Sequence, residues 1–260
     1  MSFTVIIPAR FASTRLPGKI LKDIEGKTLL HRVFLCVKQS AADSIIVATD
    51  DQRIVDEATS IGVDVCVTDV AHESGTQRIS EVITKLKISA ETIIVNVQGD
   101  EPFMPATCIE QVAKLLIEND QIEMATLYTP LLGYNEIADS NVVKVVVNKN
   151  DEAMYFSRAS IPWFRDEYEQ SNYSTEHLQN TFRHIGIYAY RAGFVNKLIA
   201  YPSCQLEQIE KLEQLRALWN GHKIKVAQAI NVPGPGIDSE SDLVLARERV
   251  RLEDSGQSGR

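Results

Sequence analysis

The first half of the chain alternates short apolar runs with segments whose apolar residues recur at helical spacing. The runs, rich in Val and Ile, span residues 3–7, 44–48, 63–67 and 92–97. Because nearly every position in them is apolar, they suit strands of a parallel sheet covered on both faces. Helical stripes span 29–37, 79–86 and 105–116, the last with Pro105 at the first helical position. This alternation predicts a doubly wound α/β fold with a mostly parallel sheet.

The second half of the chain has a less regular pattern. Strand candidates span 123–131, 142–147, 153–157, 184–190 and 224–228. Apolar residues over 206–219 recur on one face and predict a single amphipathic helix carrying Leu206, Ile209, Leu212, Leu215 and Trp219. A polar excursion covers 165–182. A Pro/Gly turn at 232–237 leads into a charged helix from about Ser239, and residues 254–260 resemble a loose tail.

Composition narrows the class of protein. The chain has 260 residues, 44% apolar, with a net charge of -8, which suits a globular protein with a substantial core. The acidic balance argues against nucleic-acid or membrane-surface partners. No apolar run approaches the roughly 20 residues of a membrane span, and the N-terminus lacks a signal-peptide pattern. The scattered cysteines Cys36, Cys66, Cys108 and Cys204 form no CxxC pair, which favours a reduced cytosol.

Positive charge gathers in the loop after the first predicted strand. Arg10, Arg15 and Lys19 lie there, and no carboxylate occurs before Lys22. Such a loop is either a solvated basic segment or a binding place for a polyanion. Glycine-based phosphate motifs are excluded, because Gly18 is the only glycine in the loop and Gly18-Lys19 is followed by Ile20. If phosphates bind here, side-chain cations must hold them.

Carboxylates follow other predicted strands at the same rim of the sheet. Asp50, Asp51 and Asp100 come after strand candidates, and parallel sheets bind ligands at these carboxyl ends. A divalent metal that bridges phosphates needs such hard oxygen ligands. Each carboxylate also has a structural interpretation. Asp100 can close a turn, Asp50 and Asp51 read best as helix caps, and Asp238 or Ser239 can cap the last helix.

For three further sites, the sequence is compatible both with a role in ligand binding and with a purely structural role. Ser74-Gly75-Thr76 precedes a helix, where the backbone could approach a flat base, or where Ser74 or Thr76 could simply cap the helix. His184 lies within a strand, where a satisfied core histidine is the default. Arg158 could clamp a ligand carboxylate or form an internal salt bridge.

Taken together, the ordered motifs resemble the 3-deoxy-manno-octulosonate (Kdo) cytidylyltransferases over nearly the whole chain. The matching motifs are Ile7-Pro-Ala-Arg10, Arg15-Leu-Pro-Gly-Lys19, Ala48-Thr-Asp50, Ser74-Gly-Thr76, Gln98-Gly-Asp-Glu-Pro102, Tyr155-Phe-Ser-Arg158, Ile161-Pro162, His184-Ile-Gly-Ile-Tyr188 and Leu212-Glu-Gln-Leu-Arg216. The resemblance implies transfer of CMP from CTP to the anomeric hydroxyl of Kdo, with release of pyrophosphate, for lipopolysaccharide biosynthesis. It also implies Mg²⁺ dependence, a cytoplasmic location and a homodimer.

The same resemblance implies a nucleotide-diphospho-sugar transferase-like fold and roles for individual residues. One domain would span 1–253, with a nucleotide-binding half (1–122), a mixed sugar-binding and dimerisation lobe (123–222) and a return to the main sheet (223–253). The implied catalytic residues are Lys19, Arg10 and Asp100, and the implied metal ligands are Asp100 and Asp238. The implied CTP-binding residues are Ala9, Arg10, Ser13, Arg15, Lys19, Ser74, Gly75 and Arg78. The candidates for the sugar side are Gln98, Arg158, His184, Tyr188, Glu210 and Glu213.

The sequence departs from the family pattern at three positions. Gln77 stands where the family usually has an acidic residue, Ile20 replaces the customary Pro, and Pro235 lies in the turn before Asp238. Gln77 leaves the preferred ulosonic acid open, so a sialic acid or an 8-amino Kdo analogue are alternatives. A metal-dependent glycosyltransferase usually shows Asp-x-Asp where this chain has Gly99-Asp100-Glu101. A nucleotide sensor without turnover would not need both Asp100 and Asp238.

Overall fold

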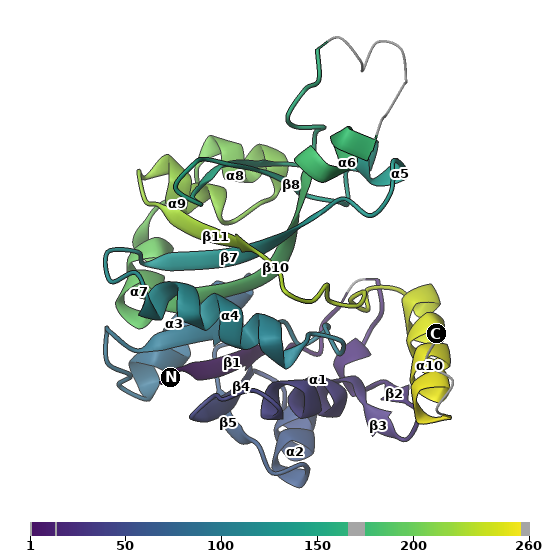
Figure 1. Ribbon diagram of the computed structural model, residues 1–260. Coiled ribbons are helices and arrows are strands. Elements are labelled where there is room, and N and C mark those ends of the chain that lie inside the picture. Colours follow the sequence, from purple (N-terminus) through teal and green to yellow (C-terminus); the bar gives the residue numbers. More distant parts are fainter. Residues whose placement is uncertain (1, 14, 166–174, 256–260) are drawn as a thin grey trace.

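The four predicted strands of the first half form the parallel part of one sheet. The computed structural model describes residues 2–13, 15–165 and 175–255. Strand β1 (Thr4–Pro8) pairs in parallel with β4 (Ser44–Thr49) and β6 (Ile93–Asn96), and β4 pairs in parallel with β5 (Asp64–Val67). Their carboxyl ends therefore meet at one rim (Figure 1). The strand predictions for this half are confirmed.

The predicted strands of the second half extend the same sheet. Among the described residues the sheet has nine strands, in the order β11-β7-β10-β6-β1-β4-β5, with β8 and β9 attached to β10. The added strands are β7 (Met124–Pro130), β8 (Lys144–Val147), β9 (Ala153–Ser157), β10 (Phe182–Arg191) and β11 (Ile224–Gln228). Strand β10 runs antiparallel to both of its neighbours, whereas β11 is parallel to β7. The hairpin of β8 and β9 forms the upper lobe in Figure 1 together with the helices above it.

Helices bury both faces of this sheet, as the apolar strands require. Successive residues of β1 alternate between two apolar clusters, with Val5 and Ile7 in one and Ile6 in the other. The first cluster is completed by α1 (Leu29–Lys38), α2 (Gln52–Ser60), α4 (Ala106–Ile117) and α10 (Glu240–Asp254). The second is completed by α3 (Gly75–Lys85), α7 (Ala192–Ala200) and α9 (Leu215–Trp219). The doubly wound α/β prediction is confirmed.

Smaller elements connect these layers. They are the 3₁₀ turn η1 (Lys19–Leu21), the hairpin strands β2 (Asp23–Ile24) and β3 (Lys27–Thr28), and the helices α5 (Asn135–Ala138) and α6 (Thr175–Asn180). Part of the predicted polar excursion, residues 166–174, and the end of the predicted tail, residues 256–260, lie outside the described residues. None of the helices described combines the length and the apolarity that crossing a membrane requires.

Two helix predictions need correction. Pro105 is the N-cap of α4 and not its first residue. The single helix predicted over 206–219 is wrong. Helix α8 (Gln205–Glu210) is followed by its C-cap Lys211, whose φ of 54° is left-handed, and α9 begins only at Leu215. Ile209 and Trp219 are consequently 68% and 57% exposed.

Contacts to strand β9 explain why the helix ends at Glu210. The Glu210 carboxylate accepts hydrogen bonds from Ser157 Oγ at 2.6 Å and from the Arg158 backbone N–H at 2.9 Å. Its backbone carbonyl accepts from Arg158 Nε at 2.7 Å. These bonds hold the last turn of α8 against the lobe. Helical periodicity alone cannot distinguish one helix from two short ones in the same register.

Candidate active site

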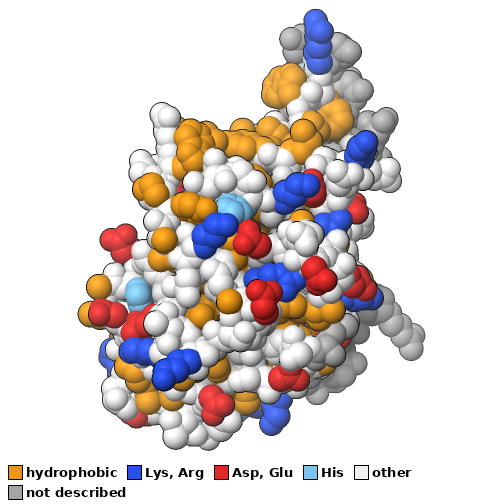
Figure 2. All heavy atoms as spheres, turned by 90° about the vertical axis from the view of Figure 1, so that its left-hand side faces the viewer, with side chains coloured by type: hydrophobic (Ala, Val, Ile, Leu, Met, Phe, Trp, Pro, Cys, Tyr) orange, Lys and Arg blue, Asp and Glu red, His pale blue; other side chains and the backbone are white. Residues whose placement is uncertain are grey.

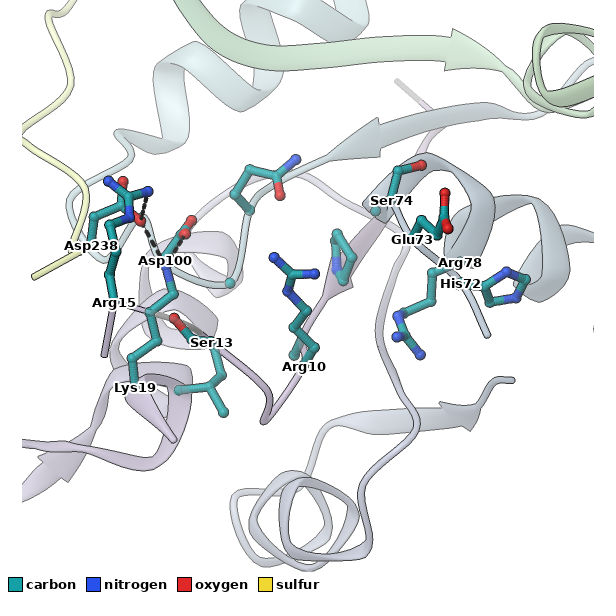
Figure 3. A pocket seen from close by; sticks show the side chains of 16 residues that line it. Arg10, Ser13, Arg15, Lys19, His72, Glu73, Ser74, Arg78, Asp100 and Asp238 are labelled. Atoms are coloured by element: carbon teal, nitrogen blue, oxygen red, sulfur yellow. Dashed lines mark hydrogen bonds and ion pairs between the residues drawn. The ribbon is translucent and has the colours of Figure 1, made fainter. Parts of the chain in front are cut away.

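A cavity of about 410 Å³ lies at the carboxyl ends of β1 and β6. The residues implied to bind CTP all line it, namely Ala9, Arg10, Ser13, Arg15, Lys19, Ser74, Gly75 and Arg78. Asp100, Asp238 and Gln98 line it too, as do His72 and Glu73, which were not predicted. Figure 3 shows an ionic cluster at one end, the residues around Ser74 at the other, and Arg10 between them.

Lys19 is the centre of the ionic cluster. Its ammonium group lies 2.6 Å from Asp100 Oδ2 and 3.0 Å from Asp238 Oδ1, and donates to the Ile237 carbonyl at 3.2 Å. Burial would lower the pKa of Lys19, but the two carboxylates outweigh burial and raise it above its ordinary value. Lys19 therefore keeps its positive charge while its side chain is only 14% exposed.

Asp238 reaches this cluster from the far end of the chain. It lies 219 residues from Lys19 in sequence and also pairs with Arg15 at 3.0 Å. The Pro/Gly turn before it is tied to the loop after β6, because the Ile237 N–H donates to the Asp100 carbonyl at 2.9 Å. Ser239, not Asp238, is the N-cap of α10. The carboxylate of Asp238 is thus free for the cavity, and the capping interpretation applies to its neighbour.

The carboxylates of Asp100 and Asp238 converge in a way that suits Mg²⁺. Both contact the same ammonium nitrogen, so their oxygens face one small space between them. Magnesium is commonly held by one or two carboxylates, with substrate phosphates and water completing its octahedron. The described residues contain no group of three or more His, Cys, Asp or Glu side chains that could surround a metal ion by themselves. Two hard oxygen donors beside a basic cavity fit a phosphate-bound magnesium ion.

Glu101, the next residue, differs from Asp100. Burial raises the pKa of Glu101 to about 7, and the neighbouring Asp100 carboxylate acts in the same direction. Its Oε2 atom is buried without a hydrogen-bond partner among the described residues. Glu101 does not line the cavity, so it is not a third candidate ligand.

The other end of the cavity is built on the N-terminus of α3. Ser74 is the N-cap, and its hydroxyl accepts from the Gln77 N–H, while Gln77 Oε1 accepts from the N–H groups of Glu73 and Ser74. The predicted capping role of Ser74 is confirmed, and it coexists with a place in the cavity wall. Gly75 also fits a wall position, because a Cβ there would lie 3.1 Å from the Pro8 ring.

Gln77 completes a capping box with Ser74. A glutamine can form this capping box as a glutamate does, which explains how Gln77 can stand where the family usually has an acidic residue. Its side chain does not line the cavity. We expect Gln77→Glu to stabilise the protein by about 0.3–1 kcal/mol, because a carboxylate accepts the same two hydrogen bonds and favours the helix N-terminus. We also expect an unchanged preference among sugar substrates. Urea unfolding and the ratio of kcat/KM values measure the two effects, and a reversed sugar preference would contradict the capping role.

The two arginines of the cavity wall have different environments. Arg78 is buried and donates to Thr68 Oγ1 at 2.5 Å and to Asp50 Oδ2 at 3.2 Å. Asp50 therefore holds Arg78 and does not cap α2; Asp51 is the cap, as predicted. Arg10 is exposed and, within the residues that the structure describes, forms no ion pair. Arg10 is the cation most available to a ligand.

Of the six sugar-side candidates, only Gln98 lines the cavity. Glu213 adjoins it, because its carboxylate accepts hydrogen bonds from Ser74 Oγ at 3.2 Å and Thr76 Oγ1 at 2.8 Å. Burial raises the pKa of Glu213. Arg158 and Glu210 bind each other through the contacts that end α8. The Arg158 side chain donates to the Glu210 and Ser140 carbonyls and forms no ion pair among the described residues, so its internal contacts are hydrogen bonds and not the salt bridge considered from the sequence. A sugar-binding role for these residues stays a prediction.

His184 and Tyr188 lie together on β10, beside an irregularity in the strand. The pairing of β10 with β7 shifts between Ile185 and Tyr188, opposite Thr126. The Thr126 hydroxyl lies 3.1 Å from the Ile185 carbonyl and 2.7 Å from that of Ile187, so its single hydrogen serves one of them. His184 Nε2 lies 3.0 Å from the same hydroxyl, and when the Thr126 hydrogen is given to a carbonyl, the tautomer protonated at Nε2 donates to the hydroxyl oxygen. The histidine is a satisfied, neutral group whose ring contacts Tyr188.

The environment of His184 leads to a pH-dependent stability. Burial lowers the pKa of His184 from 6.5 to about 3. Between pH 6.5 and pH 3 the imidazole is therefore protonated in the unfolded chain and neutral in the folded protein. The free energy of unfolding consequently falls as the pH drops through this range. We expect the wild type to lose about 2 kcal/mol more than His184→Gln between about pH 7.5 and about pH 5. Urea unfolding at both pH values checks this, and parallel losses in the two proteins would show that His184 titrates normally.

Comparison with known proteins agrees with this geometry. A family profile described as cytidylyltransferase matches residues 4–224. The chain is 52% identical over 250 residues to a 3-deoxy-manno-octulosonate cytidylyltransferase of Photobacterium profundum, covering 96% of this chain and all of the relative. It is 49% identical to 3-deoxy-manno-octulosonate cytidylyltransferase 2 of Actinobacillus pleuropneumoniae serotype 5b, covering 97% and 98% of the two chains.

A solved structure is similar as well. It is CMP:2-keto-3-deoxy-manno-octonic acid synthetase in complex with CTP, which superimposes with a TM-score of 0.87 at 35% identity. The match covers 97% of this chain and 99% of the other.

Proposed function

The chain belongs to the cytidylyltransferases, and within them to the 3-deoxy-manno-octulosonate (Kdo) enzymes, and we propose that CTP, Kdo and Mg²⁺ meet in its cavity. The anomeric hydroxyl oxygen of Kdo attacks the α-phosphorus of CTP. The bond between the α-phosphorus and the bridging oxygen breaks, and pyrophosphate leaves with the electron pair. The hydroxyl proton passes to solvent or a nearby base. The product, CMP-Kdo, serves lipopolysaccharide biosynthesis.

The observation that carries the proposal is the convergence of Lys19, Asp100 and Asp238 at one end of the cavity. Nucleotidyl transfer requires in-line positioning and neutralisation of phosphate charge, without a covalent intermediate on the protein. Lys19, held charged by its neighbours, stabilises the negative charge that grows on the departing pyrophosphate. Arg15 binds the phosphates beside it, and Arg10 extends the positive wall towards the centre of the cavity (Figure 3).

The opposite end of the cavity suits the cytosine base. Ser74 and Gly75 present backbone and a small hydroxyl at the first turn of α3, so a flat ring can approach closely. Arg78 is fixed by Asp50 and Thr68, which gives this wall a rigid shape. We place the ribose and the triphosphate of one nucleotide between these two ends of the cavity.

Asp100 and Asp238 would hold the magnesium ion, which neutralises phosphate charge and acidifies the sugar hydroxyl when bound. Lys19 occupies the space between these carboxylates and must shift to share them with a metal. Gln98 lines the cavity and would orient the sugar. We place Arg158, His184, Tyr188, Glu210 and Glu213 on the sugar side as the resemblance implies.

Pyrophosphate release tests the proposal. Purified protein is given CTP and Mg²⁺ with Kdo, an 8-amino Kdo analogue, N-acetylneuraminate or no sugar. We expect release with Kdo, and loss of release when EDTA removes the metal. Faster release with another ulosonic acid would keep the reaction and change the substrate. No release with any sugar would overturn the enzyme assignment.

A homodimer and a cytoplasmic location complete the proposal. Figure 2 shows apolar side chains gathered along the lobe, and the exposed large residues include Met154 on β9 and Ile209 on α8. Strand β9 pairs only with β8 among the described strands, so this edge could receive a second copy. Light scattering would give twice the chain mass of 29.0 kDa, and Ile209→Glu would halve it. The free thiols of all four cysteines suit a reducing compartment.

A further inference from the structure

An aromatic ring at the start of the basic loop contacts both the end of that loop and a separate helix. Phe11 directly follows Arg10, and its ring lies against Gly18, the residue before Lys19. A Cβ at Gly18 would come within 2.8 Å of the ring, and Gly18 has a φ of +65°. The Gly18 N–H also donates to the Phe11 carbonyl at 3.1 Å. Phe11 therefore joins the start of the loop, next to Arg10, to its end, next to Lys19.

Arg53 covers this ring from a different element. Its guanidinium carbon lies 3.3 Å from the centroid of the Phe11 ring, which is the distance of a stacked contact. Arg53 belongs to the first turn of α2, which follows the carboxyl end of β4. It does not line the cavity, so its cation faces the ring and not the ligand space.

The orientation of Arg53 is set by a fork of hydrogen bonds. Its Nε donates to Asp51 Oδ1 at 2.9 Å and its Nη2 donates to Asp51 Oδ2 at 2.6 Å. Asp51 is itself held as the N-cap of α2, where Oδ1 accepts from the Arg53 N–H. A bidentate pair fixes the plane of the guanidinium, and a fixed plane can stack on a ring.

We infer that Arg53 is a positioning residue for the triphosphate, acting through the ring of Phe11 on the loop that carries Arg10 and Lys19. The inference rests on the proposed function. The loop has one glycine and no backbone phosphate cradle, so the cations themselves must be placed correctly before the nucleotide arrives. The stacking of Arg53 on Phe11 reduces the number of conformations that the loop adopts in the absence of ligand. Binding then costs less ordering of the loop.

Substitutions at Arg53 separate this role from others. Arg53→Met keeps helix propensity and side-chain length but removes the planar cation. We expect a rise of about threefold to fivefold in the Kd for CTP and for inorganic triphosphate, and in the KM for CTP, with kcat within about twofold. Arg53→Lys, which keeps the charge but not the fork, should resemble Arg53→Met. Lys114→Met, which removes an exposed and carboxylate-paired cation on α4, is the matched control and should change nothing.

A double-mutant cycle with Phe11→Leu identifies the contact. If Arg53 acts through the ring, Arg53→Met adds no further loss in the Phe11→Leu protein, and Phe11→Tyr behaves as the wild type. If the two losses multiply, or if Arg53→Lys restores binding, Arg53 acts on the ligand by charge and the inference is wrong. An unchanged Kd in Arg53→Met also overturns it.

Calorimetry measures the binding of CTP and triphosphate without turnover, so the inference about Arg53 can fail while the proposed function holds, and the reverse. Wild-type pyrophosphate release tests the reaction, whereas triphosphate binding tests the stack even in the absence of turnover. The Arg53→Lys comparison does not depend on the folding of the Phe11 variants.

Discussion

Asp100→Asn should abolish pyrophosphate release while the protein stays folded. The proposed site has only two carboxylates for the magnesium ion, and an amide oxygen carries no charge with which to hold it. Metal coordination stabilises the transition state by several kcal/mol, so we expect kcat to fall at least about a thousandfold. Lys19 still has Asp238 and the Ile237 carbonyl as partners, and the Asp100 backbone keeps its bond from Ile237. The unfolding midpoint should therefore change little.

Asp64→Asn is a matched control for this variant. Asp64 is an exposed residue of β5 and lies outside the cavity, so the same chemical change should leave kcat and the magnesium dependence as in the wild type. If Asp100→Asn keeps activity within a few-fold of the wild type, the assignment of Asp100 as a metal ligand is wrong.

Lys19→Met should lower kcat by about a hundredfold to a thousandfold. Removing one preorganised charge that stabilises a developing anion typically costs this much. The substitution also leaves the carboxylates of Asp100 and Asp238 facing each other without their shared cation. We therefore expect a second effect in the absence of CTP. Mg²⁺ should raise the melting temperature of Lys19→Met more than that of the wild type, because no ammonium group competes for the site.

Lys22→Met serves as the control, since Lys22 lies three residues further along the chain and outside the cavity. Steady-state assays and thermal melts with and without Mg²⁺ measure both effects. A Lys19→Met protein with normal kcat would refute the charge-stabilising role. An equal magnesium response in both proteins would refute the competition between Lys19 and the metal.

Much of the fold follows from local patterns. The apolar runs at 3–7 and 92–97 became β1 and β6, because a strand buried on both faces needs apolar side chains at successive positions. For α2 only the cap was predicted and not the helical pattern, and α7 was missed. Only Ile54 and Ala58 of α2 are buried, so its apolar stripe is short, and α7 carries apolar residues on several sides. The family prediction rested on many ordered motifs, and the relatives confirm it.

The direction of individual side chains could not be read from the pattern. The helix predicted over 206–219 breaks at Lys211 because Glu210 binds Ser157 at the end of β9 and Arg158 directly after it, both distant in sequence. Likewise, the neighbouring residues in sequence favoured a capping role for Asp50 and for Asp238, and neither residue is the cap of its helix. Arg78 takes Asp50, and Ser239 takes the cap beside Asp238.

The amino-acid sequence thus contained the alternation of strands and helices, the basic loop without a glycine cradle and the capping box at Ser74. Each of these depends on residues a few positions apart. The meeting of Lys19 with Asp238, 219 residues away, and the stacking of Arg53 on Phe11 depend on the crossing of the chain over the sheet. Charges and rings interact through space, so their partners are known only once the backbone has brought them together.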